Sequence, residues 1–220
     1  MKNTFVKPRH LSLTILLLAI FLVACNSSLI TDLVARPGDK LFWDDFSDQS
    51  GNWPQESDSN GSMGYINSAY HISVKSTGYE LWSFSGHAYG DARVEADATR
   101  LAGPVQNLFG LICRARDNDN YYFFVISSDG YYAIGKIKAN QLTLIGQKMM
   151  SYSPDILTGN GPNHLRFDCV GQTLTGYVNG QAVAITNDAD FPDGDAGLLA
   201  GSIDTAGVDI SFDNFVVIKP

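Results

Sequence analysis

The amino-acid sequence predicts an all-β protein built from short antiparallel strands. Of its 23 acidic residues, 20 are Asp and only 3 are Glu, and the chain has 21 glycines. Asp and Gly favour turns, whereas Glu favours helices. From Leu41 onward, apolar and polar residues alternate in short runs, and no run keeps a helical period. We therefore expect a β-sandwich or a β-barrel, and 220 residues fit a single domain.

The first 24 residues are expected to form a lipoprotein signal peptide. Three basic residues precede an uninterrupted, mostly apolar run over residues 11–23. A membrane-spanning helix needs about 20 apolar residues, so this shorter run is typical of a signal peptide. It ends in Leu22-Val23-Ala24-Cys25, which resembles the bacterial lipobox, and we expect Cys25 to become a lipidated N-terminus. The alternative is an ordinary signal peptide cut near Ala24, with Cys25 incidental.

The remaining chain divides into a tether and a domain. Residues 25–40 contain Ser, Pro and Gly without a clear pattern, which predicts a flexible tether, and residues 41–220 form the expected domain. A lipid on Cys25 would hold this domain at the extracytoplasmic face of the cell membrane. Without residues 1–24, 12 basic residues remain against 23 acidic ones. This balance provides no positive surface for nucleic acid, so contact with the membrane is expected through the lipid only.

Strands are expected wherever the alternation continues between turn signals. Asn60-Gly61, Asp129-Gly130, Asn160-Gly161 and Asn179-Gly180 are such signals, because Asn-Gly and Asp-Gly suit tight hairpin loops. The expected strands, in order, cover residues 70–74, 80–84, 93–99, 109–114, 121–126, 131–136, 164–170, 174–178, 182–186 and 208–217.

The hairpin signals predict which side chains share a face. A two-residue loop at Asp129-Gly130 would place Ile126 opposite Ala133. The core face of this hairpin would then hold Tyr122, Phe124, Ile126, Ala133 and Ile137, and the solvated face Tyr121, Phe123, Tyr132, Lys136 and Lys138. The Asn179-Gly180 loop would place Leu174, Val178, Val183 and Ile185 inward, and Thr175, Tyr177, Ala184 and Thr186 outward. In the strand from His164, the core would receive Leu165, Phe167 and Cys169, and the solvent Arg166 and Asp168.

Several short motifs, in their order along the chain, resemble a known fold family. They are Leu41-Phe-Trp-Asp-Asp-Phe-Ser-Asp, Gly110-Leu-Ile-Cys-Arg, Asp119-Asn-Tyr-Tyr-Phe-Phe, Ser128-Asp-Gly-Tyr-Tyr, Tyr177-Val-Asn-Gly, Asp195-Ala-Gly-Leu and Phe212-Asp-Asn-Phe. Together they resemble the concanavalin A-like, or laminin-G-like, jelly-roll domains of bacterial surface proteins. The resemblance implies a sandwich of two antiparallel sheets, with the first and last strands adjacent. That superfamily includes lectins, glucanases, 3-keto-disaccharide hydrolase-like domains and interaction modules, so the resemblance does not select one function.

No catalytic residues are expected. Glucanases of this fold carry a Glu-x-Asp-x-(x)-Glu strand, whose acids act as nucleophile and acid. Glu95-Ala-Asp97 begins this pattern, but Ala98, Thr99 and Arg100 follow, so the second Glu is missing. Simple alternation explains the acids as a solvated strand face. The histidines show no partner pattern and are expected on the surface or in loops.

Cys113 and Cys169 are expected to form a disulfide. Once Cys25 is lipidated, they remain as an even pair in an oxidising location, and both have core-facing parity. The alternative is two buried thiols that behave as small apolar side chains.

One structural calcium ion is a further expectation. Jelly rolls that resemble this chain often hold calcium near their paired terminal strands, and Asp44, Asp45 and Asp213 would supply oxygen ligands there. A second acidic cluster, residues 187–195, is a weaker candidate. In both places Asp also serves as an ordinary turn former.

Carbohydrate binding by a non-catalytic module is the function that we expect. Sugars stack on aromatic rings while polar groups fix their hydroxyls. The expected ligand-binding residues are Tyr121, Phe123, Tyr132, Tyr177, Arg114 and Arg166. The alternatives are a glycoside hydrolase of the 3-keto-disaccharide type and a protein-interaction or structural lipoprotein.

Overall fold

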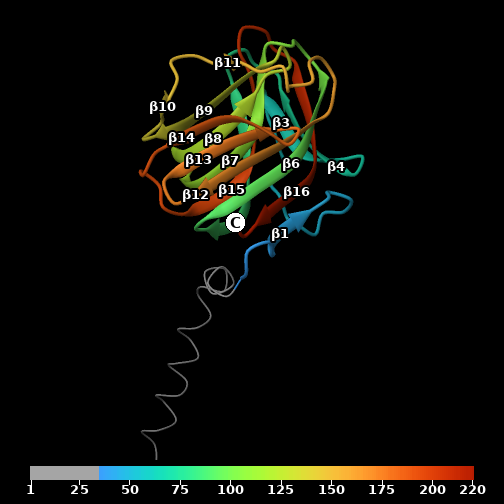
Figure 1. Ribbon diagram of the computed structural model, residues 1–220. Helices are drawn as coiled ribbons and strands as arrows, with labels where there is room; N and C mark the ends of the chain where they lie inside the picture. The colour runs from blue at the N-terminus through green and yellow to red at the C-terminus, as the bar shows by residue number, and fades with distance from the viewer. Residues whose placement is uncertain (1–34) are drawn as a thin grey trace, which may run out of the picture.

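A computed structural model describes residues 35–220, which form sixteen β-strands and no helix. Short turns with Gly, Asn and Asp separate the strands, as their sequence predicts. Every strand pair is antiparallel, and the strands form two sheets that face each other (Figure 1). The fold is therefore the two-sheet antiparallel jelly-roll sandwich that the sequence predicts.

The first sheet, sheet A, has nine strands. Their order is β14-β13-β12-β6-β16-β4-β3-β2, and β1 pairs with β16. Their bounds are β1 Lys40–Asp44, β2 Glu56–Ser57, β3 Gly61–Ile66, β4 Ala69–Val74, β6 Ala92–Ala102, β12 Asn163–Val170, β13 Thr173–Val178, β14 Gln181–Asn187 and β16 Val208–Ile218.

The second sheet, sheet B, has seven strands. Their order is β10-β9-β8-β7-β15-β5, and β11 pairs with β9. Their bounds are β5 Glu80–Tyr89, β7 Asn107–Asp117, β8 Asn120–Ile126, β9 Tyr131–Lys138, β10 Gln141–Leu144, β11 Ser151–Tyr152 and β15 Gly194–Ser202.

The main core lies between the two sheets. Strand β6 shows how alternation builds it, because Val94, Ala96 and Ala98 are fully buried while the residues between them face outward. The largest fully buried side chains are Tyr70, Tyr122, Phe46, Phe109, Phe124, Phe167, Phe212 and Phe215. They come from both sheets, so each sheet buries one face against the other.

The first and last strands lie side by side, as the resemblance implies. In β1 and β16, Trp43 pairs with Val216, and Asp44 pairs with Phe215. The backbone N–H of Gly38 also donates to the carbonyl of Lys219, at 2.8 Å. Both ends of the domain therefore meet at one end of the sandwich (Figure 1).

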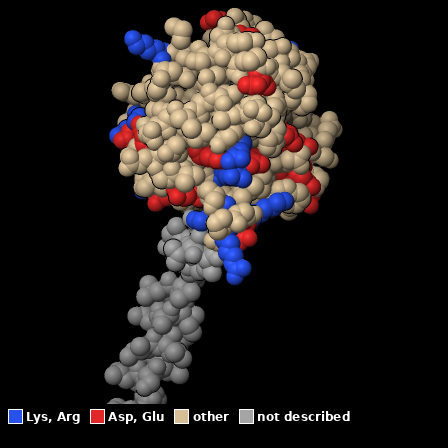
Figure 2. Space-filling model, viewed as in Figure 1, with Lys and Arg blue, Asp and Glu red and all other residues tan. Residues whose placement is uncertain are grey.

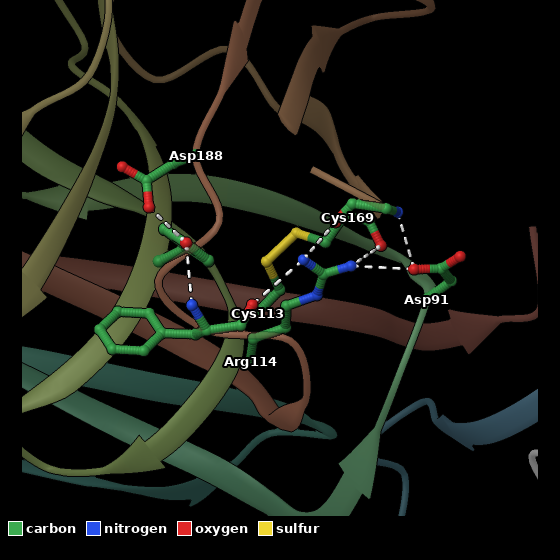
Figure 3. Close-up of a disulfide and its surroundings, with 8 residues drawn as sticks. Asp91, Cys113, Arg114, Cys169 and Asp188 are labelled. Atoms are coloured by element: carbon green, nitrogen blue, oxygen red, sulfur yellow. Dashed lines mark hydrogen bonds and ion pairs between the residues drawn. A yellow bond between two sulfur atoms is a disulfide. The ribbon is translucent and has the colours of Figure 1, made fainter. Parts of the chain in front are cut away.

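The Cys113–Cys169 disulfide is present, which confirms that prediction. It joins β7 of sheet B to β12 of sheet A, with 6.7 Å between the two Cα atoms (Figure 3). The two cysteines are 56 residues apart in the sequence. Parity places each of them on a core face, so the bond crosses the interior between the sheets.

The predicted register of the β8–β9 hairpin was wrong by one residue. Ile126 pairs with Tyr132, and Val125 pairs with Ala133. The backbone N–H of Ser127 donates to the carbonyl of Tyr131, so three residues form the loop, and the last, Gly130, has a φ of 98°. A three-residue loop that ends in a left-handed glycine is a common hairpin connection.

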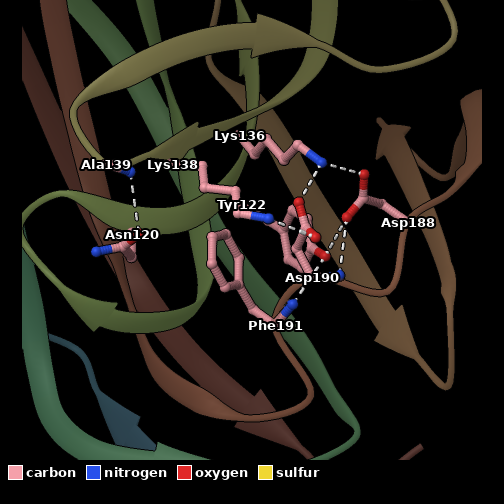
Figure 4. A network of polar contacts seen from close by, with 8 residues as sticks. All are labelled: Asn120, Tyr122, Lys136, Lys138, Ala139, Asp188, Asp190 and Phe191. Carbon is pink, nitrogen blue, oxygen red and sulfur yellow. Dashed lines mark hydrogen bonds and ion pairs between the residues drawn. The ribbon is translucent and has the colours of Figure 1, made fainter.

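This shift moves the side chains of β9 to the opposite faces. Tyr132 and Lys136 lie on the main-core side of sheet B, whereas Ala133 and Ile137 lie on its outer side. Lys136 does not mark a solvated face, because its side chain is only 15% exposed, whereas Lys138 at the end of the strand is 55% exposed. Lys136 binds Asp188 and Asp190, and Lys138 binds Asp190 at 2.8 Å (Figure 4).

The Asn179-Gly180 loop forms as predicted, but a bulge follows it. Val178 pairs with Gln181, and the register then shifts, so Gly176 pairs with Ala184 and Thr175 with Ile185. Ile185 was expected to point inward, and it is instead 72% exposed. Ala184, which was expected outside, packs against the main core. One extra residue in a strand reverses the facing of every residue beyond it.

Candidate functional site

Outward side chains of sheet A form a polar surface, called the polar face below. It consists of Arg93, Glu95, Asp97, His164, Arg166, Asp168, Tyr177, Asp213 and Asn214, from strands β6, β12, β13 and β16. Figure 2 shows acidic and basic side chains side by side in this part of the surface, over β6 and its neighbours. Alternation sends these residues outward while apolar neighbours fill the core, except that Asn214 follows Asp213 directly and lies in a register irregularity of β16, with a φ of 53°.

Register brings opposite charges together between β6 and β12. Arg93 pairs with Asp168, Glu95 with Arg166, and Asp97 with His164. Cross-strand neighbours of opposite charge each contribute roughly 0.2–1 kcal/mol. The polar face is thus largely neutralised by its own pairs, although the whole protein is strongly acidic.

His164 lies between two carboxylates. Its Nδ1 is 2.8 Å from Asp97 Oδ1, and its Nε2 is 3.4 Å from Glu95 Oε2. The hydrogen bond to Glu95, followed by that to Asp97, raises the pKa of His164 to about 9, and the same contact lowers the pKa of Glu95. His164 is therefore a cation at neutral pH. Asn214 donates from Nδ2 to the other oxygen of Asp97, at 2.9 Å.

Arg166 and Tyr177 form the aromatic part of the polar face. The Arg166 guanidinium carbon lies 4.3 Å from the centre of the Tyr177 ring. Its Nε donates to Asp168 Oδ1 at 2.7 Å, and an NH2 group donates to the second oxygen. Arg93 approaches the same carboxylate at 3.4 Å. A two-pronged arginine contact and a stacked ring hold these side chains in one geometry.

A groove of ≈ 490 Å³ continues this surface toward the far edge of sheet A. Residues of β2, β3, β4 and β16 line it, among them Glu56, Ser62, Gly64, His71, Ser73 and Asp209. Ser211 pairs with both His71 and Thr99, so it connects the groove with the polar face. Together they offer hydroxyls, carboxylates and imidazoles on one surface of the sheet.

The predicted ligand-binding residues do not form one platform. Arg166 and Tyr177 contact each other on the outer face of sheet A, whereas the Tyr121–Phe123 contact, at 6.5 Å between ring centres, is on the other sheet. Tyr121 and Phe123 do lie on the outer side of sheet B, but they are buried there in a second apolar cluster. Tyr132 faces the main core because of the register shift.

Arg114 is an interior residue, which corrects its predicted ligand role. It is 2% exposed and binds Asp91 at 2.9 Å and the carbonyls of Cys169, Gly171 and Phe191 at 2.8–3.2 Å (Figure 3). Its φ of 53° accompanies a register irregularity in β7 directly after Cys113. Such a bulge redirects a side chain, and here it sends Arg114 inward to satisfy carbonyls of another strand and loop.

The three predicted calcium ligands are not assembled into one site, although Asp45 lies near enough to Asp213 to contribute to its raised pKa, after the larger effect of burial. Asp44 is buried on the core side of β1, where it accepts from the Phe46 N–H at 2.7 Å, and burial raises its pKa. Asp213 faces outward opposite Asp97. Within residues 35–220, no group of three His, Cys, Asp or Glu side chains is arranged to hold a metal. These three carboxylates therefore do not fit one shared ion, and calcium binding stays an untested prediction.

The second acidic cluster serves another purpose. Asp188 and Asp190 bind Lys136, and the Tyr122 hydroxyl donates to Asp188 at 2.6 Å (Figure 4). Asp193 pairs with Arg116. These contacts fasten the 187–195 segment to sheet B.

His164 is the functional candidate that sequence reasoning missed. His164 is two and four residues before Arg166 and Asp168, so strand alternation places all three side chains on the same outward face. This alternation was the signal in the sequence that could have identified it. Its partners, Glu95 and Asp97, are more than 60 residues away, so their proximity depends on the pairing of β6 with β12.

Comparisons with known proteins agree on the fold. No family profile and no curated protein matches the chain. Among solved structures, the Bacillus subtilis carbohydrate-binding module CBM66 has a TM-score of 0.62 at 19% identity, over 76% of this chain and 94% of that module. A Bacillus licheniformis β-glucanase has a TM-score of 0.58 at 12% identity, over 81% of this chain and 98% of the enzyme.

A third similar structure contains a bound product. It is a Bacteroides ovatus GH16 protein of a mixed-linkage glucan locus, described in complex with G4G4G3G product. Its TM-score is 0.59 at 10% identity, over 81% of this chain and 100% of that one. The domain is thus a concanavalin A-like jelly roll, the fold shared by these carbohydrate-binding modules and glycoside hydrolases. Among the described residues, no helix is long and apolar enough to cross a membrane.

Proposed function

We propose that the polar face and the adjoining groove bind a carbohydrate without cleaving it. The observation that carries this proposal is the fixed arrangement of Tyr177 under Arg166, next to the neutralised row of Glu95, Asp97 and His164. A ring, several donors and several acceptors on one rigid sheet are what recognition of a hydroxyl-rich ligand needs. The fold shared with a carbohydrate-binding module supports the same proposal.

The charge state of the carboxylates favours binding over hydrolysis. A retaining glycosidase needs one protonated acid and one ionised carboxylate across the scissile bond. Glu95 is held ionised by His164, and Thr99 occupies the next outward position of β6 after Asp97. The hydrolase alternative predicts β-glucan cleavage that Glu95→Gln abolishes, and this result would contradict our proposal.

We also propose that the protein is a lipoprotein on the extracytoplasmic face of the cell membrane. Cys25 and the preceding apolar run lie outside the described residues, so the support comes from their sequence. A disulfide between Cys113 and Cys169 is consistent with an exported domain. Labelled palmitate should enter the wild type and not Cys25→Ser, and equal labelling of both would exclude this anchor.

A glycan array followed by titration tests the binding proposal. Tyr177→Ala should weaken the binding of an oligosaccharide found on the array by about fivefold or more, because a stacked ring contributes roughly 1 kcal/mol to the binding free energy. Tyr131→Ala is the matched control, since Tyr131 is an exposed tyrosine on sheet B. Circular dichroism should show that both variants fold. Equal affinities of Tyr177→Ala and wild type would place the ligand elsewhere.

A further inference from the structure

Sheet B carries a small cavity on its outer side, on the opposite sheet from the polar face. The cavity has a volume of ≈ 100 Å³ and lies against the second apolar cluster. Its walls include Tyr121, Phe123, Leu142, Leu144 and Met150, and one acidic residue, Glu80. Leu142 is 56% exposed, so part of the wall is in contact with solvent.

Two glycines make room for the side chains that shape this cavity. A Cβ on Gly201, which pairs with Glu80, would lie only 2.7 Å from Glu80 Cγ. A Cβ on Gly135 would overlap the Phe123 ring. The Glu80 stem and the Phe123 ring therefore lie over neighbouring strands, and Glu80 is drawn into the apolar surroundings.

Glu80 lacks a partner inside the described part of the chain. No hydrogen bond or ion pair of its carboxylate occurs there, and burial alone raises its pKa. The pKa of the Tyr121 hydroxyl is raised mainly by burial, and the nearby charge of Glu80 raises it further. Glu80 is only partly buried, so its carboxylate stays open to solvent, and a cation with an apolar body can pair with it while that body covers the apolar wall.

A wider acidic crevice adjoins Glu80 at the edge of the sandwich. Its lining includes Glu80 and Trp82 of β5, together with Glu56 of β2 and Asp58, which follows β2. These acids attract a cation toward Glu80 and disfavour an anion. The cavity and the crevice share Glu80, so a ligand could place its charged end at the carboxylate and its apolar end in the cavity.

We propose that this cavity binds a small primary amine with an apolar chain of about four to five carbons. The ammonium group donates to Glu80, and the chain packs among Tyr121, Phe123 and Leu144. An apolar cavity of about 150 Å³ holds the six carbons of benzene, so ≈ 100 Å³ accommodates about four carbons, and a fifth extends along the partly exposed wall at Leu142. Charge complementarity selects the amine over a fatty acid of the same length.

Titration calorimetry of the full chain at neutral pH and low salt tests this proposal. The probes are n-pentylamine, n-pentanol and n-pentanoate, which share one chain and differ in charge. We expect the amine to bind at least about fivefold more tightly than the alcohol, because its hydrogen bond to Glu80 joins two opposite charges. Pentanoate should bind most weakly. No binding of the amine, or equal binding of all three, would overturn the proposal.

Substitutions then locate the site. Glu80→Gln should reduce amine affinity to that of the alcohol and leave alcohol binding unchanged. Glu56→Gln removes the same charge from the crevice without touching the cavity, and should change amine affinity less than twofold. Ala133→Leu should fill the cavity and abolish binding of both probes in a protein that circular dichroism shows to be folded. Equal losses in the two glutamate variants, or full binding by folded Ala133→Leu, would refute the site.

Discussion

Arg114 and Arg116 are two positions apart, yet their surroundings differ completely. Arg114 is buried among carbonyls and Asp91, whereas Arg116 is half-exposed and pairs with Asp193. Arg114→Ala should lower the free energy of unfolding by about 3 kcal/mol, because it leaves buried carbonyls and a carboxylate unpaired. Arg116→Ala, the matched control, should lower it by less than about 1 kcal/mol. Urea denaturation measures both, and similar losses would show that Arg114 is not a structural anchor.

His164 should make stability depend on pH. Its folded pKa of about 9 lies above its usual value of 6.5, so its contribution is fully present below pH 6.5 and is lost as pH rises through 9. The side chain is 44% exposed, so we expect no more than about 1 kcal/mol. Wild type should therefore have a higher melting temperature than His164→Gln at pH 6, and the two melting temperatures should converge at pH 10. A His164→Gln difference that does not shrink over this range would contradict the ion triad with Glu95 and Asp97.

At the scale of elements, a glycine determines how closely the sheets approach. A Cβ on Gly176 of β13 would overlap the Phe124 ring of β8, from the opposite sheet. Gly176→Ala should therefore lower the free energy of unfolding by about 1–3 kcal/mol through overpacking. Thr173→Ala, at the exposed start of the same strand, should change it by less than about 0.5 kcal/mol. A neutral Gly176→Ala would show that the ring moves aside freely.

Strand positions were predictable from the sequence because alternation is a local signal. The prediction that Arg93, Glu95, Asp97 and Thr99 form the outward face of β6 is confirmed. The Asn179-Gly180 turn also lies where the sequence predicts it. Register was harder to predict, because a three-residue loop and a two-residue loop can share the Asp129-Gly130 pair. The one extra loop residue places Tyr132 on the main-core side of sheet B.

The candidate site was predictable only in part, for a different physical reason. Arg166 and Tyr177 belong to adjacent strands of one hairpin, so their contact follows from local pairing. The contacts of His164 with Glu95 and Asp97 depend on which distant strands pair, which the alternation of either strand does not specify. Burial of Tyr121 and Phe123 also depends on distant segments, because side chains of β5, β10 and β15 pack beside them on the outer side of sheet B.

At the scale of the whole molecule, the chain enters and leaves the domain at the same end. The β1–β16 pair and the Gly38–Lys219 hydrogen bond fix this arrangement. An anchor at Cys25, as we propose, would hold the sandwich by this end. Neither the polar face on sheet A nor the cavity on sheet B includes a residue of β1, the strand that the chain enters first.

The disulfide should be the largest single contribution to the stability of the sandwich. It joins the two sheets covalently across a sequence separation of 56 residues, and the chain-entropy estimate for such a loop is about 4 kcal/mol. The double variant Cys113→Ala/Cys169→Ala should lose roughly this free energy of unfolding in urea. Cys25→Ser, at the cysteine outside the domain, should leave it unchanged. Non-reducing mass spectrometry of wild type should give a cross-linked peptide, and two freely alkylated thiols in never-reduced protein would contradict the bond.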